Sequence, residues 1–106
     1  MVRIKICGIT NEKDALWAVN LGVDYIGFNF YKNSPRKISP KLAAQIIGKL
    51  PSFTQPVGVF VNEEIRVVKR IAEKCRLNLL QLHGEESPQY CRELQAQSPR
   101  LKIIKV

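Results

Sequence analysis

The sequence predicts an α/β fold built on a parallel β-sheet. Three observations support this prediction: short apolar runs alternate with amphipathic segments along the whole chain, the connections between them are short, and helix-capping residues precede the amphipathic segments. Alternation of this kind is typical of parallel strands joined by right-handed crossovers. The length of 106 residues, with 45% hydrophobic and 25% charged residues, fits one globular domain and not a disordered chain.

Five short runs, rich in β-branched or other apolar residues, are expected to form the strands: 3–7, 25–30, 57–61, 79–83 and 101–106. The second run is apolar almost without interruption, which is typical of a strand that is buried on both faces. Glycine stops the first and fourth runs, at Gly8 and Gly84. The runs therefore have the length and the punctuation of strands in a buried parallel sheet.

The four amphipathic segments between these runs are expected to form helices. Each begins at a residue whose side chain can cap a helix: Asn11, Ser39, Asn62 and Ser87. Proline follows two of these caps, at Pro40 and Pro88, where the first helical position tolerates it. Gly22 is expected to end the first helix, since glycine adopts the left-handed conformation of a helix terminus without steric cost. Glu85 and Glu86 are expected to complement the dipole of the last helix.

Two architectures fit this alternation: an open five-stranded sheet with helices on both faces, or part of an eight-stranded barrel. The periodicity of the sequence does not separate them. The last predicted strand ends at Val106 and no helix follows to cover it. We therefore expect residues 1–106 to be a single incomplete domain, with apolar side chains of its open sheet facing water.

The composition argues against several classes of protein. The formal charge is +8, but the cations are scattered along the chain, and the basic cluster Arg66–Arg76 is not interleaved with aromatic residues, so a nucleic-acid partner is not expected. The three cysteines have no CxxC spacing and His83 is the only histidine, so neither a disulfide scaffold nor a metal site is expected. The phosphate loops GxGxxG and GxxxxGK[ST] are absent, which argues against a dinucleotide or P-loop protein.

The sequence also carries no signal for a membrane. No run approaches the roughly 18–20 apolar residues of a membrane span. The first ten residues do not resemble a signal peptide, because Lys5 interrupts their apolar stretch. We therefore expect a cytoplasmic protein without a membrane partner.

Candidate functional residues follow from the predicted fold. In parallel α/β folds the functional site lies at the carboxyl ends of the strands, which places Cys7 and His83 on one rim, with Arg36 in the loop after the second strand. Each has a simpler interpretation: an inert apolar thiol, a solvated loop cation and a histidine bonded to the backbone. Cys75 and Cys91 lie on apolar helix stripes and are expected to be plain core residues.

The motifs along the chain resemble one enzyme family in order and spacing. The segments that carry the likeness are Ile4–Asn11 (IKICGITN), Gly27–Tyr31 (GFNFY), Ser34–Pro40 (SPRKISP), Val57–Asn62 (VGVFVN) and Leu79–Glu86 (LLQLHGEE). Together they resemble phosphoribosylanthranilate isomerase over essentially the whole chain. The resemblance implies the N-terminal portion, strands one to five and helices one to four, of a TIM (β/α)8 barrel.

The resemblance also implies a reaction and roles for three residues. The family catalyses an Amadori rearrangement of N-(5-phosphoribosyl)anthranilate to 1-(2-carboxyphenylamino)-1-deoxyribulose 5-phosphate in tryptophan biosynthesis. By resemblance Cys7 is the general base, which Arg36 or His83 could help to stabilise as a thiolate. Arg36 binds the anthranilate end of the substrate, where a guanidinium suits a carboxylate, and His83 binds substrate on the same rim. No cofactor and no metal are expected.

The likeness covers only part of such a barrel. The family's general acid, an aspartate, is expected past Val106, and so is the phosphate site after strands seven and eight. We therefore expect the isolated chain to be inactive. Three hypotheses remain: the N-terminal part of an isomerase, a non-catalytic half-barrel that associates with itself or with a complementary chain through its open edges, and a basic module that binds nucleic acid.

Overall fold

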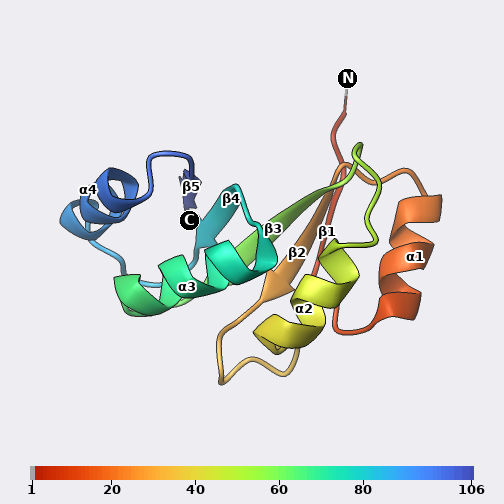
Figure 1. Cartoon of the computed structure of the whole chain (residues 1–106), viewed down its shortest axis with the longest axis horizontal. Helices are drawn as coiled ribbons and strands as arrows, with labels where there is room; N and C mark the ends of the chain where they lie inside the picture. The colour runs from red at the N-terminus through yellow and green to blue at the C-terminus, as the bar shows by residue number, and fades with distance from the viewer. Residues whose placement is uncertain (1) are drawn as a thin grey trace.

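A computed structural model of the chain describes residues 2–106 and shows strands and helices in strict alternation (Figure 1). The strands are β1 (Lys5–Cys7), β2 (Tyr25–Asn29), β3 (Gln55–Phe60), β4 (Leu79–Leu82) and β5 (Lys102–Lys105). The helices are α1 (Glu12–Asn20), α2 (Pro40–Ile47), α3 (Ile65–Cys75) and α4 (Pro88–Gln97). All elements expected from the sequence are present, with strand ends that differ from the expected ones by one or two residues.

The five strands form one parallel sheet in the order β1-β2-β3-β4-β5. Each strand lies beside its predecessor, so the chain always advances in the same direction. Right-handed crossovers then place every helix on the same face of the sheet. An open sheet with helices on both faces requires the strand order to reverse, so that interpretation is wrong. The arrangement is that of part of a (β/α)8 barrel, with β1 and β5 at the edges (Figure 1).

The hydrophobic core lies between the sheet and the helices. On the helix-facing side of the strands, Ile26, Phe28, Leu80 and Leu82 are fully buried. Ala43, Ile46, Val68 and Leu94 cover them from the helices, also with almost no exposure. Cys75 is buried and Cys91 is half-buried against this core, as expected for plain core residues.

The other face of the sheet is concave and carries the side chains that alternate with the core. Lys5 and Cys7 of β1 lie on it, in register with Tyr25 and Gly27 of β2. The sequence predicts that apolar side chains of this open face meet water, but Val57 and Val59 of β3, which lie on it, are buried. The face also carries polar side chains: Lys5, Gln55, Gln81 and Lys102. The polar side chains of this face are suited to bind a polar ligand.

Three of the four expected helix caps are confirmed. The Asn11 side chain accepts a hydrogen bond from the Asp14 N–H at 2.8 Å, and the Ser39 and Ser87 hydroxyls accept equivalent bonds at 3.2 and 3.0 Å. Gly22, with φ of 77°, follows the end of α1.

The expected cap at Asn62 is wrong. Helix α3 begins after Glu64, and Asn62 has a φ of 50°. Its side-chain oxygen accepts a hydrogen bond from the Glu85 N–H at 2.7 Å, in the loop after β4. A tertiary contact between two loops therefore takes the place of the cap.

None of the helices within residues 2–106 combines the length and the hydropathy that crossing a bilayer requires.

Candidate functional site

Cys7 ends β1 at the carboxyl edge of the sheet, with its side chain on the concave face. Gly27 lies beside it in register on β2. A Cβ atom at position 27 would stand 2.7 Å from the Cys7 Sγ, which is closer than such atoms approach. The sulfur therefore occupies space that only glycine leaves open. Because Cys7 is exposed, its thiol is available to a ligand on the concave face.

Arg36 reaches the same edge because the loop after β2 folds back on itself. The backbone carbonyl of Asn29 accepts a hydrogen bond from the Ile38 N–H at 2.9 Å, which closes the loop at its base. Within the loop, the Arg36 N–H donates to the Ser34 hydroxyl at 3.1 Å. These bonds present Arg36 toward the end of β1.

Gly8 allows the Arg36 side chain to cross the chain next to Cys7. Gly8 has a φ of 86°, in the left-handed region that favours glycine. A Cβ atom at this position would stand 2.5 Å from the Arg36 Cδ and 3.4 Å from its Nη1. The guanidinium side chain thus packs directly over the residue that follows Cys7, and these two candidate residues share one corner of the site.

His83 follows β4 and extends its ladder, since its N–H donates to the Phe60 carbonyl at 2.9 Å. Its ring is exposed, and its Nδ1 lies 3.4 Å from the Gln81 Nε2. In the part of the chain that the structure describes, no hydrogen bond or ion pair joins any two of Cys7, Arg36 and His83. The three side chains therefore stand at the same edge, with their functional groups available to a ligand.

Two polar residues of the concave face link the corner of Cys7 to His83. The Lys5 ammonium donates a hydrogen bond to the Gln81 Oε1, although β2 and β3 lie between their strands. Neither residue is among the candidates that the strand ends predict. The alternation of a strand could have indicated both, because Lys5 precedes Cys7 by two positions and Gln81 precedes His83 by two.

Glu86 fastens the loops below this edge, a role that its sequence pattern does not predict. Its carboxylate is buried and accepts hydrogen bonds from the Asn62 and Gly84 N–H groups at 2.7 and 2.9 Å. The Lys105 ammonium lies 3.4 Å away. Burial by itself raises the pKa of Glu86, but the backbone hydrogen bonds and Lys105 outweigh it and hold the pKa below its usual range. The ionised carboxylate thus ties the ends of β3, β4 and β5 together.

Residues 2–106 contain no cluster of three or more His, Cys, Asp or Glu residues that could hold a metal ion. The chemistry available at the site is that of a thiol, a guanidinium, an imidazole and an ammonium group. These groups can move protons and bind an anion.

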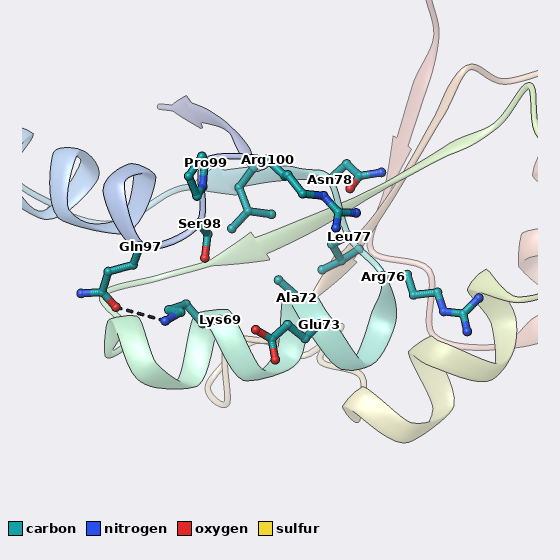
Figure 2. Close-up of a pocket in the computed structure, with 11 residues that line it drawn as sticks. Lys69, Ala72, Glu73, Arg76, Leu77, Asn78, Gln97, Ser98, Pro99 and Arg100 are labelled. Carbon is teal, nitrogen blue, oxygen red and sulfur yellow. Dashed lines mark hydrogen bonds between the residues drawn. The ribbon is translucent and has the colours of Figure 1, made fainter.

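A surface hollow of about 680 Å³ lies at the opposite end of the sheet (Figure 2). It is bounded by the last turns of α3 and α4 and by Asn78 and Leu101, which immediately precede β4 and β5. Figure 2 shows the Lys69 ammonium donating to the Gln97 side-chain oxygen, at 3.3 Å, across its rim. In barrels of this type the amino ends of the strands serve stability and the carboxyl ends serve chemistry, so the candidate site is the edge with Cys7.

A parallel sheet in consecutive strand order, with helices on one face, defines the class: a barrel-type α/β protein. Comparison with known proteins identifies the family within that class. The family model of N-(5'-phosphoribosyl)anthranilate (PRA) isomerase matches residues 4–106. The chain belongs to this family.

Individual relatives agree with the family model. The N-(5'-phosphoribosyl)anthranilate isomerase of Trichlorobacter lovleyi is 55% identical over 95 residues, which cover 90% of this chain and 46% of the relative. A structure of monomers generated from the dimeric phosphoribosylanthranilate isomerase of Thermotoga maritima superposes with a TM-score of 0.90 and 48% identity. The match covers 99% of this chain and 52% of that one.

A structure of a phosphoribosyl anthranilate isomerase in complex with reduced 1-(o-carboxyphenylamino)-1-deoxyribulose 5-phosphate superposes with a TM-score of 0.92 and 50% identity, over 99% of this chain and 53% of that one. The chain therefore spans about half the length of the relatives it matches.

Proposed function

We propose that the protein that carries this chain isomerises N-(5-phosphoribosyl)anthranilate to 1-(2-carboxyphenylamino)-1-deoxyribulose 5-phosphate in tryptophan biosynthesis. The single observation that supports this most strongly is the match of the isomerase family model to residues 4–106. The reduced product analogue held by a 50% identical relative indicates the class of ligand, a phosphorylated sugar joined to a carboxyphenylamino group. Substrate and product are isomers, so the reaction needs proton transfers and no net oxidation.

In the proposed reaction Cys7 acts as the general base. The ribose ring opens to a protonated imine. The Cys7 thiolate then takes the proton from C2, the electron pair of the C2–H bond forms the C1–C2 double bond of the enolamine, and the electron pair of the C=N double bond neutralises the nitrogen. As the ketone forms, C1 takes up a proton and the C2 hydroxyl loses one, so atoms and charge balance. The exposure of Cys7 beside Gly27 supports this role, because a ligand on the concave face can reach the sulfur directly.

Arg36 and His83 bind the substrate in this proposal. The guanidinium of Arg36, which packs over Gly8, offers a planar pair of N–H donors that suits the anthranilate carboxylate. His83 offers its exposed ring at the end of β4. The general acid that assists ring opening and the phosphate-binding residues are expected outside residues 1–106. We propose that residues 1–106 form a single incomplete barrel domain and that the protein is cytoplasmic.

The proposal is tested with protein purified from a host whose own isomerase gene is deleted. The purified protein is incubated with freshly formed N-(5-phosphoribosyl)anthranilate, and the product is identified by chromatography against an authentic standard. Conversion well above the uncatalysed rate is expected. If the complete protein binds the reduced product analogue but does not convert the substrate, binding is retained and catalysis is contradicted; if it does neither, the proposed function is wrong.

A further inference from the structure

A relay of hydrogen bonds crosses the concave face from β1 to the end of β4. The Lys5 ammonium donates to the Gln81 Oε1, and the Gln81 Nε2 lies 3.4 Å from the His83 Nδ1. The first contact spans two intervening strands. It therefore requires the long side chain of Lys5 to extend over the concave face, toward the edge where the candidate site lies.

The chemistry of the groups fixes the direction of every hydrogen bond in this relay. A lysine ammonium carries three donors and no acceptor, so the Gln81 atom that faces Lys5 must be its carbonyl oxygen. The other end of the amide is then the NH2 group, which can only donate. That group faces His83, so the His83 Nδ1 must be the acceptor. Because the ammonium can only donate, it determines which end of the Gln81 amide is the oxygen, and the assignment does not depend on how the amide oxygen and nitrogen were distinguished.

A neutral imidazole carries one proton, on one of its two ring nitrogens. When Nδ1 accepts a hydrogen bond, the proton lies on Nε2. The relay thus selects one tautomer of His83 and makes Nε2 an N–H donor, while the ring remains exposed on the face where the ligand is expected.

We propose that Lys5 is a positioning residue, which acts through Gln81 to hold neutral His83 in the tautomer protonated on Nε2. The ring then presents an N–H donor to an oxygen atom of the anionic substrate; this last step rests on the proposed function, whereas the tautomer does not. Without Lys5, the Gln81 amide can turn over and offer its oxygen to a proton on Nδ1. Both tautomers then become accessible, and the donor toward the substrate is lost for part of the time.

The tautomer is measured directly by long-range 1H–15N correlation of the imidazole, at about pH 9, where an imidazole is ordinarily neutral. The His83 signals are assigned by their loss in His83→Asn. In the wild-type protein we expect the proton on Nε2. In Lys5→Met, which keeps an unbranched apolar stem, we expect the Nδ1-protonated fraction to rise about threefold or more. Lys5→Arg retains a side chain that only donates and should restore the wild-type pattern.

Two further variants separate this relay from general effects of charge or folding. Lys41→Met removes a positive charge from exposed Lys41 of α2 and should leave the tautomer unchanged. Gln81→Glu places an acceptor-only carboxylate opposite Nδ1 and should put a proton on that nitrogen. Far-UV circular dichroism of each variant confirms that it folds.

Two results would overturn the proposal: a wild-type ring protonated on Nδ1, or a folded Lys5→Met variant with the wild-type tautomer. The kinetic consequence is tested separately. If the protein is the proposed isomerase, Lys5→Met should raise KM more than it lowers kcat, because the relay orients a binding group. A protein with the expected tautomer but no isomerase activity would contradict the proposed function and leave the relay intact.

Discussion

Two glycines decide where the functional groups of the candidate site can stand. Gly27 leaves the space that the Cys7 sulfur fills, and Gly8 leaves the space that the Arg36 side chain crosses. A methyl group would stand 2.7 Å from the Cys7 Sγ at position 27 and 2.5 Å from the Arg36 Cδ at position 8, so the neighbouring side chain would have to move. At Gly8 the φ of 86° adds backbone strain for any other residue. The geometry of the site thus depends on residues that have no side chain and no chemistry of their own.

The Cys7 thiol is expected to be essential for turnover. Cys7→Ala in the active protein should lower kcat by about 10²-fold or more, since loss of a positioned general base typically costs this much. The matched control is Cys75→Ala, at a buried thiol that donates to the Pro40 carbonyl at 3.3 Å in the helix layer. This variant should retain kcat and lose stability only. Steady-state kinetics decide the matter, and near-normal turnover by Cys7→Ala would remove Cys7 from the mechanism.

Arg36 is expected to act through the geometry of its guanidinium and not through its charge alone. Arg36→Lys keeps the charge but loses the planar pair of donors. We expect kcat/KM to fall on the order of tenfold, as the loss of one charged hydrogen bond of about 1.5 kcal/mol implies. Lys32→Ala, which removes an exposed cation from the same loop, serves as the control. An unchanged kcat/KM in Arg36→Lys would identify Arg36 as a solvated loop residue.

At the scale of residues, the sequence predicts part of the site. The rule that function lies at the carboxyl ends of parallel strands selects Cys7 and His83, and the family resemblance gives them and Arg36 their proposed roles. The rule does not select Lys5 or Gln81, because both lie inside strands, where a polar residue has no obvious partner in the sequence. Their hydrogen bond joins positions 76 residues apart, and only the curvature of the sheet brings them together.

At the scale of elements, the loops after β3 and β4 are held by one carboxylate. Glu86 accepts from the backbone of both loops and lies 3.4 Å from Lys105 of β5. The prediction of a helix cap at Asn62 fails for the same reason, since its side chain bonds to the neighbouring loop. A capping pattern in a sequence reflects only hydrogen bonds between neighbouring residues. Here the Asn62 side chain instead accepts a hydrogen bond from Glu85, 23 residues away.

Glu86 is expected to make the stability of the protein depend on pH in acid. Its pKa is lowered in the folded state, so its contribution is fully present above the ordinary glutamate pKa of about 4.3. As the pH falls through that value and then through the lower pKa of the folded state, the carboxylate is protonated and the contribution is lost. Urea titrations at a series of pH values measure this loss as a decrease in the free energy of unfolding.

Glu86→Gln should remove part of that dependence. At neutral pH the variant should be less stable by roughly 1–3 kcal/mol, as is typical when charged hydrogen bonds to a buried group are lost, and its stability should change less with acid. Glu85→Gln, at an exposed neighbour, is the control and should behave like wild type. If Glu86→Gln kept both the stability and the acid dependence of wild type, the clamp would be structurally unimportant.

At the scale of the whole molecule, the strand order distinguishes two architectures that the sequence leaves open. Strand and helix patterns are local and are the same in a barrel and in a doubly wound sheet. The order of the strands depends on where each crossover packs, which hydrophobic periodicity does not encode. The consecutive order in this sheet leaves β1 and β5 as edges and the concave face without a covering layer in this structure. The relatives' greater length is consistent with further strands that cover them.

A polypeptide limited to these 106 residues is therefore expected to associate with itself. The outer edges of β1 and β5 offer unpaired backbone groups, which are templates for another strand. Apolar side chains next to them are also exposed, among them Ile104 at 46%. Without the general acid expected elsewhere, this polypeptide should also give no measurable conversion of substrate. Sedimentation velocity reports the association state, and near-UV circular dichroism of the buried rings of Phe28 and Phe60 reports the packing.

Matched variants locate the surface that is responsible for the association. Ile104→Lys places a charge beside the β5 edge and should shift the sedimenting species toward the monomer. Leu21→Lys adds the same charge at a residue that is 56% exposed at the end of α1, on the helix side, and should leave the distribution unchanged. A wild-type polypeptide that sediments as a monomer, with sharp aromatic signals and a cooperative thermal transition, would contradict the prediction. It would show that five strands of this barrel can protect their own edges.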